Sequence, residues 1–221
     1  MRTTKICLLL PAYNESQRIG QVIQEASAFI SDIVVIDDGS TDSTSEIAAD
    51  NGAFCLTQTP NRGKGFALRK GFAYALANGY NAVFTMDSDG QHAPADIPRF
   101  LEHFARTQPD ILIGARVRAR ETMPLHRRIN NAFISWVGSQ LCGQTVPDFQ
   151  SGYRLIRATV LEKIQLKTER YETESELLIQ AGRRGFRIER LPIAARYGDY
   201  RSDIKPLREI WLFTKLLIRS L

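Results

Sequence analysis

Five short runs rich in apolar and β-branched residues alternate with segments of helical periodicity, and this alternation is the strongest constraint on the fold. The runs cover residues 6–10, 33–37, 53–58, 82–87 and 111–115, and each of the first four precedes a helical stretch. Strands joined through helices pair in parallel, with the helices packed on the faces of the sheet. The pattern predicts an α/β fold with a mostly parallel, doubly wound sheet flanked by helices.

Three apolar stripes mark the helix faces expected to cover this sheet. Their three- and four-residue spacing places each set on one side of a helix. We expect Gly52 and Gly79 to end two of the helices and Pro94 to begin another. The stripes are Ile19, Val22, Ile23, Ala26 and Ile30; Leu68, Phe72, Ala75 and Leu76; and Ile97, Phe100, Leu101 and Phe104.

The pattern changes after residue 115. A basic segment leads to a helix, and a strand at 153–156, a helix at 175–181 and a strand at 187–195 follow. A chain of 221 residues with 43% hydrophobic content can bury one sizeable core, so we expect a single domain. One face of the first helix in this part carries Ile129, Ala132, Phe133, Trp136, Val137 and Leu141.

Polar segments follow the first four predicted strands, at the sheet edge where open α/β proteins bind ligands. They read PAYNE at 11–15, DDGS at 37–40, NRGKG at 61–65 and DSDGQH at 87–92. An aromatic ring, several carboxylates and the glycine-flanked Lys64 at one edge suit a nucleoside diphosphate. The glycine spacing is not that of a P-loop, so it does not indicate an ATPase.

Asp87 and Asp89 are the predicted centre of a metal site. Carboxylates two residues apart in a turn can direct oxygens to one hard divalent cation that also binds phosphate, and Gln91 could add a third oxygen. Capping of the turn is the structural alternative for an Asp-x-Asp pair. Its position directly after a hydrophobic strand favours the metal.

Asp37 and Asp38 have two interpretations. One is a ligand-binding role at the sheet edge. The other is entry into the next helix, ahead of Ser43 and Glu46, which have the spacing of a capping box.

Together with DFQSGYR at 148–154, these segments resemble family 2 glycosyltransferases with the GT-A fold. The resemblance is strongest to the branch of dolichyl-phosphate mannose synthases and their bacterial polyprenyl-phosphate relatives, and it covers nearly the whole chain. It implies an inverting transfer of a sugar from a UDP- or GDP-sugar to a polyprenyl phosphate, with Mg²⁺ or Mn²⁺ as cofactor. Residues 1–118 would bind the nucleotide sugar, 119–205 would form the acceptor side, and 206–221 would form an amphipathic helix.

The resemblance also implies roles for individual residues. The catalytic set would be Asp89, Asp148, Gln150 and Arg116, and the metal ligands Asp87, Asp89 and Gln91. The donor-binding set would be Pro11, Ala12, Tyr13, Glu15, Asp38, Gly63, Lys64, Asp87, Ser88, Asp89 and Arg116.

The net charge of +5 predicts anionic partners. The aromatic and glycine pattern of an RNA-binding sheet is missing, so we expect no nucleic acid. A lipid phosphate is already ionised and needs positive charge, for which the candidates are Arg127, Arg128, Arg196 and Arg201. A solvated basic surface is the equal alternative for any one of them.

Three other functions stay open to different degrees. A transferase acting on a sugar hydroxyl, in polysaccharide or glycolipid synthesis, would need a general base such as Asp148, Glu172 or Glu174. An inactive nucleotide-sugar-binding protein is an alternative from outside the enzymes. A nucleotidyltransferase is disfavoured, because a glycine- and arginine-rich loop would then follow the first strand.

No apolar run reaches the roughly 20 residues that span a bilayer, and the N-terminal run does not resemble a signal peptide. We expect a cytoplasmic protein that is peripheral at the membrane. The helix at 206–221 could lie in the membrane interface or pack on the sheet or a partner subunit, and a homo-oligomer is left open.

Overall fold

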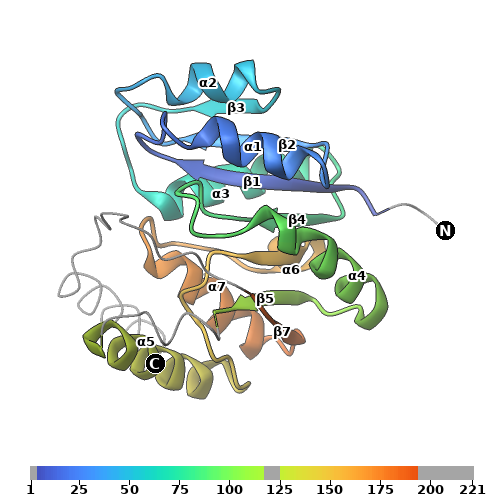
Figure 1. Cartoon of the computed structure of the whole chain (residues 1–221). Coiled ribbons are helices and arrows are strands. Elements are labelled where there is room, and N and C mark those ends of the chain that lie inside the picture. The colour runs from blue at the N-terminus through green and yellow to red at the C-terminus, as the bar shows by residue number, and fades with distance from the viewer. Residues whose placement is uncertain (1–3, 117–124, 194–221) are drawn as a thin grey trace.

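The computed structural model describes residues 4–116 and 125–193, and of residues 125–130 it describes the backbone alone. Within these ranges the chain forms a seven-stranded sheet flanked by helices (Figure 1). The elements in chain order are β1 (Ile6–Ala12), α1 (Ile19–Ser27), β2 (Ile33–Asp37), α2 (Thr44–Asp50), β3 (Phe54–Thr57), α3 (Lys64–Ala77), β4 (Ala82–Thr85), the 3₁₀ turn η1 (Pro94–Asp96), α4 (Ile97–Thr107), β5 (Ile111–Ala115), α5 (Leu125–Cys142), β6 (Arg154–Arg157), α6 (Ala158–Lys163), α7 (Glu172–Arg183) and β7 (Ile188–Pro192).

The strand order is β3-β2-β1-β4-β6-β5-β7, and the strands are parallel except for β6, which runs antiparallel to β4 and β5. The predicted mostly parallel sheet is therefore confirmed. Because β6 lies between β4 and β5, the early and late parts of the chain share one sheet. Its first residue, Arg154, pairs with Thr85 and Ile113 near the ends of β4 and β5. The segment before β6 thus reaches the edge where the parallel strands end.

Helices cover both faces of the sheet (Figure 1). One core cluster joins Leu8 and Leu10 of β1 to α1, α2 and α4. The other joins Cys7 and Leu9, which point to the opposite face, to α3, α5, α6 and α7. The three predicted stripes face these cores, with Leu76 and Leu101 only partly buried.

The predicted apolar face of α5 is only partly buried: Val137 and Leu141 pack against the core. Phe133 and Trp136 are 54% and 63% exposed, and Ala132 is exposed too. The helix instead buries a set that includes Ser135 and Gly138. The Phe149 backbone N–H donates to Ser135 Oγ at 3.2 Å, and a Cβ on Gly138 would lie 2.7 Å from the Phe149 ring. The contact with the 148–152 loop therefore selects the small polar face rather than the aromatic one.

Helix boundaries largely follow the predicted signals. Gly52 and Gly79, at φ of 85° and 69°, follow α2 and α3, and Pro94 opens η1 directly before α4. The capping box is wrong: Ser43 precedes α2 without a side-chain cap bond, because its φ of −77° and ψ of 26° are not the extended conformation that a capping residue adopts.

Candidate active site at the carboxyl edge of the sheet

Short hydrogen bonds draw the loops at the carboxyl edge of the sheet together. Ser88, after β4, donates its hydroxyl to the Pro11 carbonyl at 2.8 Å. The backbone N–H of Asp38 donates to the Ala12 carbonyl at 2.9 Å. Thr85 Oγ1 donates to the Gly152 carbonyl at 2.8 Å. The loops after β1, β2 and β4 and the loop before β6 therefore meet at one place.

Asp87 lies at the centre of this edge, beside Lys64 at the start of α3. Lys64 Nζ is 2.5 Å from Asp87 Oδ1 and 3.1 Å from Glu174 Oε1. Burial alone would lower the pKa of Lys64, but the two carboxylates raise it above its usual value. Burial alone would raise the pKa of Asp87, but Lys64 and His92 lower it. Lys64 and Asp87 thus form a charged ion pair at neutral pH.

Asp89 is the second predicted metal ligand, and its surroundings suit a cation. Its carboxylate accepts the backbone N–H of Gln91 at 2.9 Å. Burial and the nearby negative charge of Asp87 raise the pKa of Asp89. A divalent ion would relieve this repulsion. Across 4–116 and 131–193, no three or more His, Cys, Asp or Glu side chains cluster as a metal site; Mg²⁺ commonly takes one or two carboxylates plus substrate phosphates.

Asp38 shapes the loop that carries Lys64. Its buried carboxylate accepts the backbone N–H groups of Arg62 and Gly63 at 3.0 and 2.6 Å, and also the side-chain amide of Gln58. Gly63 adopts a φ of 106°, a conformation that side chains rarely allow. The contact of Asp38 with a nucleoside stays a prediction. The structure adds a second role for Asp38, which holds the loop that precedes Lys64.

The loop after β1 presents Tyr13 at the same edge. Tyr13 is 46% exposed, as a ring that stacks on a nucleobase would be. Asn14 has a φ of 56°, and its side-chain oxygen accepts the backbone N–H of Thr41 at 2.8 Å, which ties this loop to the one after β2. Glu15 Oε2 lies 3.2 Å from Arg18 Nη1, and burial raises the pKa of Glu15. The donor-binding roles of Tyr13 and Glu15 stay predictions.

Asp148 and Arg116 form a two-pronged ion pair between the end of β5 and the loop before β6. Arg116 Nε and Nη2 each donate to a carboxylate oxygen at 2.7 Å, and the Arg116 backbone N–H donates at 3.2 Å. Burial alone would raise the pKa of Asp148, but Arg116 lowers it. The catalytic and donor-binding roles of Arg116 stay predictions, and the structure shows Asp148 orienting its guanidinium. Gln150 lies half-buried in the same loop.

The acidic run at the start of α7 divides into distinct roles. Glu174 binds Lys64. Glu176 accepts the backbone N–H groups of Lys167 and Thr168 at 3.0 Å, so it holds the preceding loop. Glu172 opens the helix, where a negative charge is favourable.

Sequence reasoning missed His92. Its Nε2 is 3.5 Å from Asp87 Oδ2, and its ring lies against Tyr153 with 5.3 Å between centroids. The only signal was its place in the DSDGQH turn. Of the predicted acceptor arginines, Arg127 and Arg128 belong to α5 but have side chains outside the described part, and Arg196 and Arg201 lie wholly outside it.

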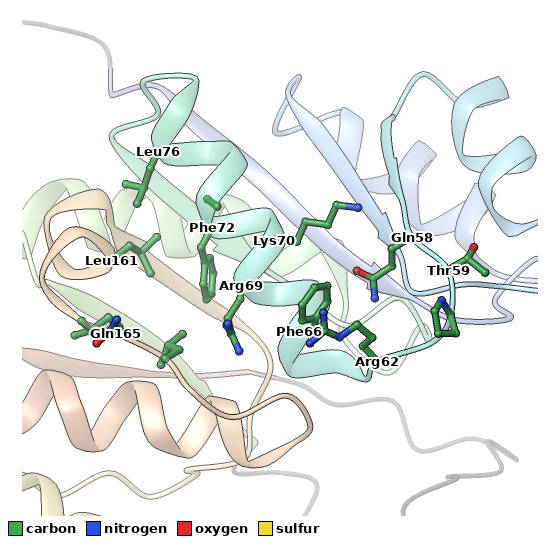
Figure 2. A pocket seen from close by; sticks show the side chains of 14 residues that line it. Gln58, Thr59, Arg62, Phe66, Arg69, Lys70, Phe72, Leu76, Leu161 and Gln165 are labelled. Carbon is green, nitrogen blue, oxygen red and sulfur yellow. The ribbon is translucent and has the colours of Figure 1, made fainter.

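A groove of about 680 Å³ lies on the outer side of α3 (Figure 2). Gln58 and Arg62 border one end, Phe66 and Phe72 of α3 form one wall, and Leu161 of α6 forms part of the other. None of the predicted site residues lines it. The candidate active site is therefore a separate surface.

The match of residues 7–165 to the sequence pattern of "Glycosyl transferase family 2" decides the family. The chain belongs to this family. It is 31% identical over 218 residues to UDP-N-acetylglucosamine--dolichyl-phosphate N-acetylglucosaminyltransferase of Methanococcus voltae, covering 88% of this chain and 87% of the relative. It is 30% identical over 203 residues to undecaprenyl-phosphate mannosyltransferase of Micrococcus luteus, covering 86% and 82%.

Among solved structures, the family 2 chain is similar to glucosyl-3-phosphoglycerate synthase of Mycobacterium tuberculosis in complex with Mn²⁺, UDP and glucosyl-3-phosphoglycerate. The TM-score is 0.72 at 25% identity, covering 98% of this chain and 78% of the other. The predicted family and the predicted GT-A class of fold are confirmed.

Proposed function

We propose that this family 2 glycosyltransferase moves a sugar, with inversion, from a nucleoside diphosphate sugar to a polyprenyl phosphate. The observation that carries the proposal is the convergence of Asp87, Asp89 and Lys64 at the sheet edge, with the Arg116–Asp148 pair on the acceptor side. Relatives named for transfer to dolichyl and undecaprenyl phosphate support the acceptor class. The UDP complex of the structural relative supports a nucleotide-linked donor.

Asp87, Asp89 and Gln91 would hold Mg²⁺ or Mn²⁺. When bound, the ion offsets the negative charge that builds on the leaving diphosphate. The all-oxygen ligands and the repulsion between the two carboxylates fit a hard divalent cation. The Mn²⁺ in the structural relative supports the same assignment.

Lys64 and Arg116 supply positive charge that is fixed before the donor binds. Each is held by carboxylates: Lys64 by Asp87 and Glu174, Arg116 by Asp148. Charges oriented in advance stabilise a developing diphosphate without the cost of reorganisation. The proposed role of both residues is to stabilise the departing nucleoside diphosphate.

The acceptor is a phosphate rather than a sugar hydroxyl, for a reason visible in the site. A hydroxyl must lose its proton to a base, whereas a lipid phosphate is ionised at neutral pH. Asp148 and Glu174 are both engaged by cations, and the lowered pKa of Asp148 makes it a weak base. Glu172 is the candidate base for the alternative, since its buried Oε2 accepts no hydrogen bond from the part of the chain that the structure describes.

We also propose peripheral contact with the cytoplasmic face of a membrane, through α5. Phe133 and Trp136 expose their rings side by side, with 6.5 Å between centroids. Exposed aromatic pairs suit the boundary between lipid and water. In the described part of the chain, no helix has the length and apolar character to cross a bilayer.

Vesicle sedimentation tests the membrane contact. Replacing Phe133 and Trp136 by serine is expected to reduce binding to vesicles that contain anionic lipid. Phe54→Ser is the matched control, since Phe54 is 52% exposed on the edge strand β3. Equal loss in both variants contradicts a specific role for α5.

Transfer assays with UDP- and GDP-sugars, with Mg²⁺ or Mn²⁺, test the enzymatic function. Release of nucleoside diphosphate should depend on metal, rise with a short polyprenyl phosphate and be lost in Asp89→Ala. Turnover that ignores the lipid phosphate and responds to a sugar acceptor would favour the hydroxyl alternative, with Glu172→Gln as the next variant. Tight donor binding without turnover would favour an inactive binding protein.

A further inference from the structure

Arg154, the first residue of β6, is 2% exposed although it carries a charge. It sits between β4 and β5 in the interior of the sheet, where its Cα is in register with Thr85 and Ile113. Burying a cation is costly unless hydrogen bonds and opposite charges compensate it. A buried arginine at this position therefore indicates a specific structural role for its guanidinium.

The guanidinium of Arg154 binds three main-chain carbonyls in two separate segments. Nε donates to Ser151 O at 2.7 Å and Nη2 donates to Phe149 O at 2.9 Å. Nη1 donates to Glu174 O at 2.7 Å, in the first turn of α7. The Arg154 side chain thus links the 148–152 loop to α7, which carries Glu174, a partner of Lys64.

Both tied segments contact groups of the proposed active site, and the α7 turn does so through Glu174, which pairs with Lys64. At one end of the loop, Asp148 orients Arg116. At the other end, Gly152 packs so closely on Asp87 that an added Cβ would lie 2.6 Å from a carboxylate oxygen. Burial lowers the pKa of Arg154, and the nearby carboxylates of Glu174, Asp148 and Asp87 oppose this effect. The loop, the metal-binding carboxylate and the start of α7 share one cationic centre.

We propose that Arg154 is a positioning residue that holds the 148–152 loop and the Glu174 turn against Asp87, and so sets how the acceptor meets the donor sugar. This role rests on the proposed transferase function. Arg154 is buried behind the loop and acts on the reaction only through the groups it holds. The parts of the proposed donor site after β1 and β2 are held by hydrogen bonds that do not involve Arg154.

The arrangement requires arginine rather than any cation. A guanidinium is a planar fork with five N–H donors, whereas an ammonium is a single point at the end of a flexible stem. Lysine at position 154 keeps the charge but cannot serve Ser151 O, Phe149 O and Glu174 O together. Arg154→Lys therefore separates positioning from charge.

The test compares Arg154→Lys and Arg154→Gln with wild type, and uses Arg157→Lys as the matched control. Arg157 lies on the same strand, and its Nε donates to another carbonyl, Pro109 O, at 2.8 Å, toward the opposite edge of the sheet. Three readouts are needed: transfer to a polyprenyl phosphate, hydrolysis of the donor by water, and hydrogen–deuterium exchange of backbone amides.

For Arg154→Lys we expect the kcat of transfer to fall about 100-fold, the effect of a misplacement of about 1 Å. The KM for the donor should stay within about threefold. Hydrolysis should fall less than transfer, because water needs no placement by the 148–152 loop, so the ratio of transfer to hydrolysis drops. Amide exchange should rise in residues 148–153 and 172–175 and stay unchanged in β1 and β2. Arg157→Lys should match wild type in all three readouts.

Two results would overturn the inference. One is unchanged amide exchange in the 148–153 segment. The other is a proportional loss of transfer, hydrolysis and donor binding, which would show a general loss of folded protein. Arg154→Gln provides the same comparison if the lysine variant does not fold. Failure of the proposed transferase function would give a different result, because wild type itself would then show no transfer. The exchange data would still show whether Arg154 holds the 148–152 loop and the Glu174 turn.

Discussion

The close contact between Gly152 and Asp87 predicts a large effect from a single added methyl group. A Cβ at position 152 would lie 2.6 and 2.7 Å from the two Asp87 carboxylate oxygens and 2.8 Å from Cγ. Favourable contacts between heavy atoms lie near 3.5 Å, so the overlap is roughly 0.8 Å. The φ of Gly152 is not positive, so alanine meets a steric obstacle there rather than a backbone one.

Gly152→Ala must therefore displace either the Asp87 carboxylate or the loop before β6. Overpacking of this kind costs about 2 kcal/mol in the free energy of unfolding, which lowers Tm by about 6 °C for a chain of this size. A carboxylate moved by most of an ångström also loses its geometry toward the metal and Lys64. We expect transfer to fall about 100-fold.

The assay pairs urea unfolding with a titration of Mn²⁺ in the presence of the nucleoside diphosphate of the active donor. Gly79→Ala is the control, because Gly79 has a φ of 69° and open space around its Cβ position. The strained backbone should cost about 1 kcal/mol without touching the site. If Gly152→Ala shows the same rate of transfer and the same Mn²⁺ affinity as wild type, the reasoning is refuted.

Three further predictions concern charge. Asp148→Asn should lower the free energy of unfolding by about 3 kcal/mol at pH 7, since it removes the carboxylate that accepts three hydrogen bonds from Arg116. Because the folded-state pKa of Asp148 lies below its usual value of 3.8, this stabilisation is present above about pH 4 and is lost as the pH falls through the folded pKa; urea unfolding from pH 7 to pH 3 checks this, and a difference that does not change with pH contradicts it. Glu174→Gln should weaken Mn²⁺ binding about tenfold, because Lys64 then pairs with Asp87 alone and competes with the metal; an unaltered Mn²⁺ titration would count against this competition. Chelation of divalent cations should abolish transfer, and Mn²⁺ should restore it; full activity in excess chelator contradicts the metal assignment.

Local signals predicted most of the fold correctly. Strand and helix positions follow from hydrophobic periodicity, and glycines and Pro94 marked the helix ends. The antiparallel direction of β6 was not predicted, because periodicity carries no information about strand direction. The exposure of the aromatic part of the apolar face of α5 was not predicted, for a related reason. Phe133 and Trp136 are the most apolar choice, but Phe149 needs the space at Gly138 and the hydroxyl of Ser135.

The candidate site was predicted to the level of its segments. Residues that follow parallel strands meet at one edge in any doubly wound sheet, so the PAYNE, DDGS, NRGKG and DSDGQH segments could be grouped before the structure was known. The partners of each charge could not be predicted. Lys64 pairs with Glu174 and Arg116 with Asp148, and these pairs join distant parts of the chain.

The sequence by itself determined the alternating strands and helices, the Asp-x-Asp turn and the family, because each depends on residues that are neighbours along the chain. Only the tertiary structure decided that Asp38 holds the Lys64 loop, that His92 lies beside Asp87 and that Arg154 is buried beneath the 148–152 loop. The physical reason is that the energy of a charge depends on burial and on its partners. Both are set by how β6 and α7 pack against the sheet.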